Sequence, residues 1–355
     1  MTPALADYTT LGLGGPARSF VSAATETDLI DAVRAADAAA EPVLLIGGGS
    51  NLVISDTGFP GTVIHVNTRG IGYAAAERAG GPEGAVDVTV AAGEDWDGVV
   101  AATVAEGLAG LESLSGIPGR AGATPIQNVG AYGREVAEVI TQVRVYDRRE
   151  DQVLVIGNED CSFAYRTSLF KSTGARYVVL DVTFRLAAQA LSLPLKYAEL
   201  AAELGVTVGE RAGIGEARSA VLKIRARKGM VLSPGDPDTR SAGSFFTNPV
   251  ITVAEFAAVE AAAAAGAAGP VPSYDAGDGL VKVPAAWLIE HAGFAKGYGA
   301  PSPARVSSKH TLALVNTGNA TTADLLTLAR EIVSGVRSAY GVTLTPEPIL
   351  IGVSL

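Results

Sequence analysis

The sequence predicts an α+β fold, and three observations carry that prediction. Apolar and polar residues alternate in several short segments, most clearly at 177–186, as they do in half-buried strands. Helical periodicity with capping signals occurs in fewer segments and is strongest at 322–340, which Gly341 closes. Strands and helices do not alternate regularly, so their order favours an α+β fold over a doubly wound parallel sheet.

The other elements follow from the same two periods. Further helices are predicted at 25–40, 95–108, 216–229, 253–265 and 284–292. Further strands are predicted at 17–22, 42–46, 52–56, 86–92, 139–146, 152–156 and 311–316, and a final strand runs from 342–344 on through 349–353. The first helix opens on a capping box between Thr25 and Asp28. Residues 9–16 read as a flexible opening, and 188–193 as a hinge into a second unit.

Composition and charge restrict the class of protein. A chain of 355 residues suggests two or three domains, and 48% hydrophobic with 18% charged residues is typical of a globular protein with an ample core. The formal net charge of −10 argues against a general nucleic-acid-binding or membrane-surface role, so a polyanionic ligand must meet a local basic cluster. No signal sequence and no apolar stretch of membrane-spanning length is recognisable, which makes the cytosol the expected compartment.

The few cysteines and histidines argue against disulfide bonds and metal sites. Cys161 is the only cysteine, so we expect neither an internal disulfide nor a cysteine-rich metal site. His65, His291 and His310 are scattered along the chain and do not form a ligand cluster. We therefore expect no metal centre.

A glycine-rich turn at 47–51, Gly-Gly-Gly-Ser-Asn, follows the buried strand at 42–46. Successive main-chain N–H groups in such a turn can form a nest for an anion. The next segment, 52–56, reads as a strand and turn instead of a helix, so the turn is neither a Rossmann fingerprint nor a P-loop. A plain tight turn is the alternative.

The loop at 115–133 is the most informative stretch of the chain. Its five glycines and two prolines leave no helical or strand period, yet its apolar residues are spaced to pack, so we do not expect disorder. Glycine lets a flat ligand come close to the main chain, where Gln127, Asn128 and main-chain N–H groups could bond to it. We predict a cofactor loop; an ordered surface loop is the alternative.

Seven short motifs occur in a fixed order along the chain. They lie at 10–17 (Thr-Leu-Gly-Leu-Gly-Gly-Pro-Ala), 47–51, 118–119 (Pro-Gly), 125–133 (Pro-Ile-Gln-Asn-Val-Gly-Ala-Tyr-Gly), 165–166 (Tyr-Arg), 242–249 (Ala-Gly-Ser-Phe-Phe-Thr-Asn-Pro) and 346–347 (Pro-Glu). In this order they resemble the UDP-N-acetylenolpyruvoylglucosamine reductases, and the resemblance covers essentially the whole chain. Residues 191–200, with Tyr197, resemble the segment that marks the type I form of that family.

The resemblance implies a fold and a domain order. It implies a two-lobed FAD-binding domain of the vanillyl-alcohol-oxidase type, with one lobe at 1–65 and a second at 66–190. An α+β substrate-binding domain at 191–341 follows, and the C-terminal strand within 342–355 returns to the first lobe. The implied function is NADPH-dependent reduction of UDP-N-acetylenolpyruvoylglucosamine to UDP-N-acetylmuramate through FAD. This is a cytoplasmic step of peptidoglycan synthesis, and thus of cell-wall biogenesis, cell shape and division.

The resemblance also assigns the cofactor loops. It implies non-covalent FAD, and the sequence is compatible with this, since neither 47–51 nor 115–133 contains a His or Cys that could carry the flavin. The implied FAD-binding residues are Gly47, Gly48, Gly49, Ser50, Asn51, Gly116, Pro118, Gly119, Gly122, Ala123, Gln127, Asn128, Gly130, Ala131, Tyr132 and Gly133.

Three catalytic residues are carried over from the family. Adding a hydride to the enolpyruvyl group builds negative charge on the adjacent carboxylate, and the resemblance gives Arg166 and Glu347 as the donors that stabilise it. Glu347 can donate only while it holds a proton. Ser244 is the implied proton donor, with Phe245 and Phe246 placed to exclude water. The alternatives are a surface ion pair for the arginine, a solvated strand end for the glutamate and a turn cap for the serine.

Six residues are implied to anchor the UDP-sugar: Tyr165, Tyr197, Lys228, Asn248, Tyr274 and Lys282. Lys228 ends the run at 225–228, Arg-Ala-Arg-Lys, which is the only dense basic run of the chain and suits a diphosphate. The alternative is a solvated helix face.

Two other functions stay open beside this one. A flavin oxidase of the same fold would act on an alcohol or sugar, and a non-catalytic protein would bind a nucleotide without turnover. The sequence gives no indication of protein partners.

Overall fold

The computed structural model describes residues 2–76 and 84–355, which form two compact units. The main parts of unit 1 are Ala17–Gly48 and Pro60–Arg227. Unit 2 consists of Pro3–Pro16, Gly49–Phe59 and Lys228–Leu355. Each unit therefore combines segments that lie far apart in the sequence. The predicted domain ranges 1–65, 66–190 and 191–341 stay predictions.

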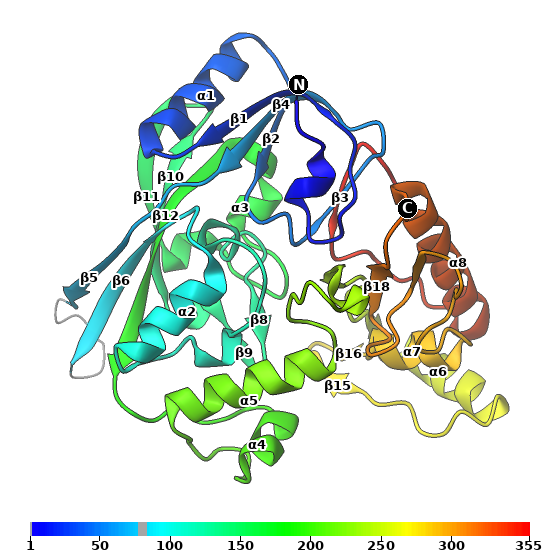
Figure 1. Ribbon diagram of the computed structural model, residues 1–355. Helices are drawn as coiled ribbons and strands as arrows, with labels where there is room; N and C mark the ends of the chain where they lie inside the picture. The colour runs from blue at the N-terminus through cyan, green and yellow to red at the C-terminus, as the bar shows by residue number, and fades with distance from the viewer. Residues whose placement is uncertain (1, 77–83) are drawn as a thin grey trace. The chain divides into compact units, whose positions relative to one another are not determined.

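A six-stranded sheet forms the centre of unit 1 (Figure 1). Its antiparallel strands are, in spatial order, β11 (Gln152–Gly157), β10 (Ile140–Asp147), β12 (Tyr177–Ala188), β6 (Ala85–Ala91) and β5 (Ile71–Ala75), with β7 (Leu108–Ala109) paired to the end of β12. The predicted apolar face of β12 is buried, as Val178 and Phe184 show, but Val179 and Thr183 on the opposite face are buried as well, so the strand is not half-buried. The central strand is therefore covered on both sides.

A smaller sheet in unit 1 leads to the glycine-rich turn. Its strand order is β1 (Ala17–Ala23), β4 (Phe59–Val66) and β2 (Val43–Ile46). The pairing of β2 with β4 is parallel and sets Ile46 opposite His65. Helix α1 (Glu26–Ala38) follows β1 and opens on the predicted capping box, with Thr25 as its N-cap.

The other helices of unit 1 close its core. They are α2 (Trp96–Ala105), the short α3 (Leu169–Ser172), α4 (Ala198–Leu204) and α5 (Ile214–Arg227). Trp96 of α2 packs on Phe184 of β12, with 5.7 Å between the ring centroids, so α2 is held against the large sheet. Leu200 and Ile224 join α4 to α5 in a separate apolar cluster. A two-stranded ribbon, β8 (Gly130–Ala131) with β9 (Arg134–Glu135), ends the loop at 115–133.

Unit 2 contains short strands and three helices. One sheet has the order β13 (Ser241–Ser244), β18 (Ala313–Asn316), β17 (Ala304–Val306), and another has the order β14 (Val250–Thr252), β16 (Leu280–Lys282), β15 (Tyr274–Asp275). β3 (Leu52–Ile54) pairs in parallel with β19 (Ile349–Ile351). The helices are α6 (Val253–Ala265), α7 (Ala285–His291) and α8 (Thr322–Tyr340), the last with the predicted bounds and Gly341 as its left-handed cap.

The predicted flexible opening at 9–16 is wrong. Leu11 is fully buried in the core of unit 2, and its carbonyl oxygen accepts a 2.9 Å hydrogen bond from the Asn316 amide. Thr10 donates its hydroxyl to the Ser241 carbonyl at 2.7 Å. A Cβ on Gly15 would lie 2.1 Å from a main-chain oxygen, so this glycine permits close packing and not flexibility.

The sequence reading also missed or misplaced some elements. Residues 342–344 are not a strand, although Val342 and Leu344 are buried. β4, β5, α4 and most of the short strands of unit 2 were not predicted, because their patterns are short or lie among loop residues. Within the described residues, no helix is long and apolar enough to cross a membrane. Among the same residues, no three or more His, Cys, Asp or Glu side chains lie close enough together to hold a metal ion.

Candidate active site

The predicted cofactor loop at 115–133 is held in place by hydrogen bonds within unit 1. The Gly116 N–H donates to the Asp97 carboxylate at 2.6 Å, and the Gly122 N–H donates to the Ala92 carbonyl at 2.9 Å. A Cβ on Gly122 would lie 2.4 Å from that of Ala92, so only glycine permits this contact. The loop is therefore an ordered part of the fold.

The glycine-rich turn lies directly against this loop. A Cβ on Gly48 would lie 2.8 Å from the Gly119 Cα, and one on Gly47 would lie 3.0 Å from the Arg120 Cγ. The main chains of the two predicted cofactor segments thus touch with no side chain between them at Gly48. Main chain that carries no side chain suits an anionic, flat ligand, so these half-buried glycines fit a flavin dinucleotide.

The rest of the turn belongs to unit 2. The Asn51 amide donates to the Glu347 carbonyl at 3.5 Å, and the Asn51 carbonyl accepts the Ile349 N–H at 2.9 Å. The segment that carries the predicted acid is therefore joined to the end of the glycine-rich turn.

Asn128 has a different role from the one that its amide suggested. The side chain is buried; its nitrogen donates to Glu135 at 2.7 Å and to the Ala164 carbonyl at 3.3 Å, while its oxygen accepts the Ala137 N–H at 3.2 Å. Because these bonds use both amide N–H groups, a cofactor contact at Asn128 would have to come from the main chain. The side chain holds the loop to the segment before Arg166.

Tyr165 and Arg166 are the two central residues of a tight turn in unit 1. Reciprocal main-chain bonds between Ala164 and Thr167, at 3.1 and 3.2 Å, close this turn. Arg166 has a φ of +56°, lies 5.6 Å from the Tyr165 ring centroid, and donates to the Gly130 carbonyl at 3.3 Å. The predicted catalytic arginine is thus attached to the predicted cofactor loop.

An aromatic pair joins that loop to the segment predicted to bind substrate. The rings of Tyr132 and Tyr197 meet edge to face at 5.4 Å between centroids. Burial raises the pKa of Tyr132 to about 12, although a hydrogen bond from the buried Arg225 guanidinium acts in the opposite direction. Burial also lowers the pKa of Arg225. Sequence reasoning assigned no role to Arg225.

Two arginines of the basic run at 225–228 have partners within unit 1. Arg227 pairs with Glu203 at 2.7 Å, and Arg225 is buried against Tyr132. Helical geometry sends neighbouring side chains in different directions, so a dense run need not become a dense patch. Lys228, the first residue of this part of unit 2, remains the candidate for a diphosphate contact.

The structure brings Ser244 and Glu347 together within unit 2. Ser244 ends β13, and the Glu347 N–H donates to the carbonyl of the next residue, Phe245, at 2.9 Å. Phe245 and Phe246 are 0% and 1% exposed and belong to the hydrophobic core, so they anchor this pair of segments and do not cover it. Gly243 has a φ of +75°, and a Cβ there would meet nothing within 4 Å. The approach to Ser244 is open on that side.

Three predicted substrate anchors also gather in unit 2. Lys282 lies in the middle strand β16, directly opposite Tyr274 on β15. The Val283 N–H donates to the Pro249 carbonyl at 3.0 Å, which brings Asn248 to the same end of the sheet. The Asn248 amide oxygen accepts the N–H of Ala285 at 2.9 Å, so its nitrogen is oriented for another acceptor.

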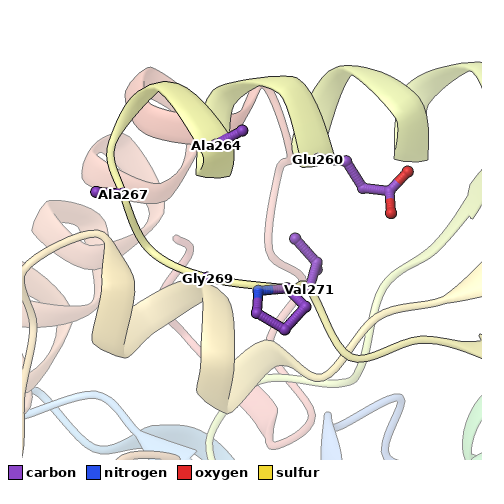
Figure 2. Close-up of a pocket in the computed structure, with 6 residues that line it drawn as sticks. Glu260, Ala264, Ala267, Gly269 and Val271 are labelled. Carbon is purple, nitrogen blue, oxygen red and sulfur yellow. The ribbon is translucent and has the colours of Figure 1, made fainter.

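A hollow at the C-terminal end of α6 contains none of the predicted site residues. It has a volume of about 480 Å³ and is lined by Glu260, Ala264, Ala267, Gly269, Pro270 and Val271. Figure 2 shows Glu260 as its only charged side chain.

Comparison with known proteins first gives the class. Residues 17–157, which include the glycine-rich turn and the cofactor loop, match the model of an FAD binding domain. The chain is an FAD-containing oxidoreductase. Residues 236–351 match the C-terminal domain model of UDP-N-acetylenolpyruvoylglucosamine reductase.

Whole-chain relatives then give the family. The chain is 54% identical to UDP-N-acetylenolpyruvoylglucosamine reductase of Thermobifida fusca, over 99% of this chain and 97% of the relative. It is 56% identical to the reductase of that name from Streptomyces coelicolor, over 99% and 90%. The chain belongs to the UDP-N-acetylenolpyruvoylglucosamine reductase family.

A solved structure confirms the predicted α+β fold. The crystal structure of the reductase from Thermus caldophilus matches with a TM-score of 0.61, over 99% of this chain and 98% of that one. The two sequences are 24% identical, so this match bears on the fold alone.

Proposed function

We propose that this protein reduces UDP-N-acetylenolpyruvoylglucosamine to UDP-N-acetylmuramate, with NADPH as the hydride source, in the cytoplasm. The observation that carries the proposal is the identity above 50% to reductases of that name along nearly the whole chain. Bound FAD would supply the hydride transfer from NADPH to the enolpyruvyl group. The chain's own residues must bind, orient and protonate the substrate.

Arg166 and Glu347 are proposed to stabilise the substrate carboxylate. Hydride addition to the terminal carbon moves negative charge onto this carboxylate, and each preorganised donor there contributes about 3–4 kcal/mol. The planar fork of Arg166 can bind both oxygens, and its turn is attached to the cofactor loop through Gly130. Glu347 would donate in its protonated form, from a main chain fixed by Phe245 and Asn51.

Ser244 is proposed to deliver the proton to the carbon next to the carboxylate. A serine hydroxyl is a weak acid, so it can act only when it is held beside a strong carbon base. The strand ending at Ser244 is fixed by its pairing with Ala313. The missing side chain at Gly243 leaves room for the substrate to approach.

The UDP-sugar is proposed to bind through Tyr165, Tyr197, Lys228, Asn248, Tyr274 and Lys282. Asn248, Tyr274 and Lys282 form one group at the end of the β14–β16–β15 sheet and can meet hydroxyl and phosphate oxygens. Lys228 supplies a further cation. Tyr165 and Tyr197, each exposed by about two fifths, offer aromatic faces.

Anaerobic stopped-flow spectroscopy of the FAD-loaded protein tests the proposal. NADPH should bleach the flavin absorbance, and UDP-N-acetylenolpyruvoylglucosamine should then restore it in the absence of oxygen. Bleaching by an alcohol or a sugar, but not by NADPH, would instead support the flavin oxidase. A colourless protein that takes up no FAD would support the non-catalytic alternative.

A further inference from the structure

Three basic side chains gather beside the glycine-rich turn within unit 1. The strand register sets His65 opposite Ile46, the residue before Gly47. The stem of Arg120 lies against Gly47, with its Cγ 3.0 Å from the position a Cβ would occupy there. Burial lowers the pKa of His65, and the charges of Arg120 and Arg69 lower it further, so all three basic groups lie within electrostatic reach of one another.

The two arginines of this cluster differ in their partners. Arg69 donates to the Gly93 carbonyl at 2.5 Å and to Asn67 at 2.7 Å, and it lies 3.6 Å from Glu94. The Arg120 guanidinium, in contrast, makes no hydrogen bond or ion pair with any residue in 2–76 or 84–355. Within the described part of the chain, Arg120 is therefore the arginine of this cluster whose side chain forms no ion pair, although the charges of Asp95 and Glu94 act on it from a distance.

The acids nearest to Arg120 are engaged elsewhere. The Asp95 carboxylate accepts the Gly98 N–H at 2.9 Å as the N-cap of α2. The Glu94 carboxylate accepts the Gly70 N–H at 2.7 Å. A half-buried guanidinium that is bonded to no anion is costly, and its position is best explained by a ligand that supplies one.

We propose that Arg120 binds the diphosphate of FAD, with the main chain of Gly47, Gly48 and Gly119 completing the site. All of these residues lie in the segment that matches an FAD binding domain. The chain carries a net charge of −10, so a diphosphate needs a local cation, and the guanidinium fork fits two phosphate oxygens. The proposal rests on FAD as the cofactor and not on the identity of the substrate.

Arg120→Met tests the charge while it keeps most of the stem that packs on Gly47. The full-length, FAD-loaded protein is diluted, and the recovery of flavin fluorescence measures the dissociation constant. Loss of a charge-assisted hydrogen bond should weaken FAD binding by about 10–100-fold. Riboflavin, which has no phosphate, should bind the variant and the unmodified protein equally well. Added salt should weaken FAD binding less in the variant.

Arg149→Met is the matched control, because Arg149 is 75% exposed in the turn between β10 and β11. It should leave FAD binding unchanged. Arg120→Lys should restore part of the affinity as a point charge without the fork. If Arg120→Met does not fold by circular dichroism, Arg120→Gln replaces it with the same expectation.

Three results would overturn the proposal. The first is an FAD affinity that is unchanged in both neutral variants. The second is a fall in riboflavin binding by the same factor as FAD binding, which would assign Arg120 to packing alone. The third is a higher Michaelis constant for NADPH or for the UDP-sugar with unchanged FAD binding, which would assign the cation to another phosphate. A protein that binds FAD through Arg120 but does not reduce the UDP-sugar would contradict only the proposed function.

Discussion

The main-chain N–H of Glu347 donates to the carbonyl oxygen of Phe245 at 2.9 Å, next to Ser244. An isolated bridge between Phe246 and Pro346 continues the pairing. Two motifs from distant parts of the sequence therefore run side by side in unit 2. The roles proposed for Ser244 and Glu347 require their two segments to be neighbours in this way.

Replacing Ser244 by Ala should separate the two halves of the reaction. Reduction of the flavin by NADPH should stay near normal, because the hydroxyl has no role in that step. Reoxidation by the UDP-sugar should slow by about 10²–10⁴-fold, the usual contribution of a positioned acid. Stopped-flow traces measure both rates, and an equal loss in both would contradict the assigned role.

Replacing Lys228 by Met should mainly raise the Michaelis constant for the UDP-sugar. The expected increase is about 10-fold or more, because a charge-assisted bond to a phosphate contributes roughly 1.5–3 kcal/mol. Lys223→Met is the control, since Lys223 pairs with Glu203 at 2.7 Å on the exposed side of α5. Equal Michaelis constants for the two variants would mean that Lys228 does not bind the substrate and is a solvated residue at the end of the helix.

Replacing Asn128 by Ala should destabilise the protein and disturb the turn of Arg166. The change leaves the Ala137 N–H and the Ala164 carbonyl without their bonds, which costs about 2–4 kcal/mol of the free energy of unfolding. Urea denaturation measures the loss. Asn128→Asp should be worse at neutral pH, because a carboxylate would then face Glu135. Unchanged stability in both variants would show that this amide does not hold the loop.

Asp97 should make stability depend on pH. Burial by itself raises the pKa of Asp97, but hydrogen bonds from Arg218 and from the Gly116 N–H outweigh it and hold the pKa below its usual value. A lowered pKa in the folded state contributes stability above the unfolded-state value of about 3.9, and that contribution is lost as pH falls through the folded value.

Asp97→Asn should therefore be less stable than the unmodified protein at pH 7, and the difference should shrink below about pH 4. Denaturation curves at both pH values test this. Asp31→Asn is the control, because Asp31 is exposed and pairs with Arg34 of its own helix. A pH-independent difference would mean that the charge of Asp97 does not stabilise the loop.

Much of the fold could be predicted because local signals decided it. The apolar stripe and the cap of α8, and the capping box of α1, act within a few residues, so both helices were predicted correctly. The opening at 9–16 was predicted to be flexible because of its glycines. These glycines instead allow close packing, for example of Gly15 against the main chain of Asp56. That packing joins segments far apart in the sequence, which a local pattern does not reveal.

The candidate site divides in the same way. The order of the motifs indicated Ser244, Glu347 and Arg166 as catalytic residues. Arg120 and Arg225 were assigned no role, because a sequence pattern does not show whether an arginine has a partner in the folded protein. The pairing of Arg227 with Glu203 could not be predicted for the same reason, since it forms only once α4 and α5 have packed.

The sequence by itself determined the family, the FAD cofactor, the enzyme class and the main helices of this protein, because motif order, side-chain period and capping are written along the chain. Tertiary structure alone decided which glycines support close packing, that the Asn128 amide holds the loop, and that Glu347 lies beside Phe245. These contacts join residues far apart in sequence. They form only when buried apolar surface brings the segments together and every buried polar group must then find a partner.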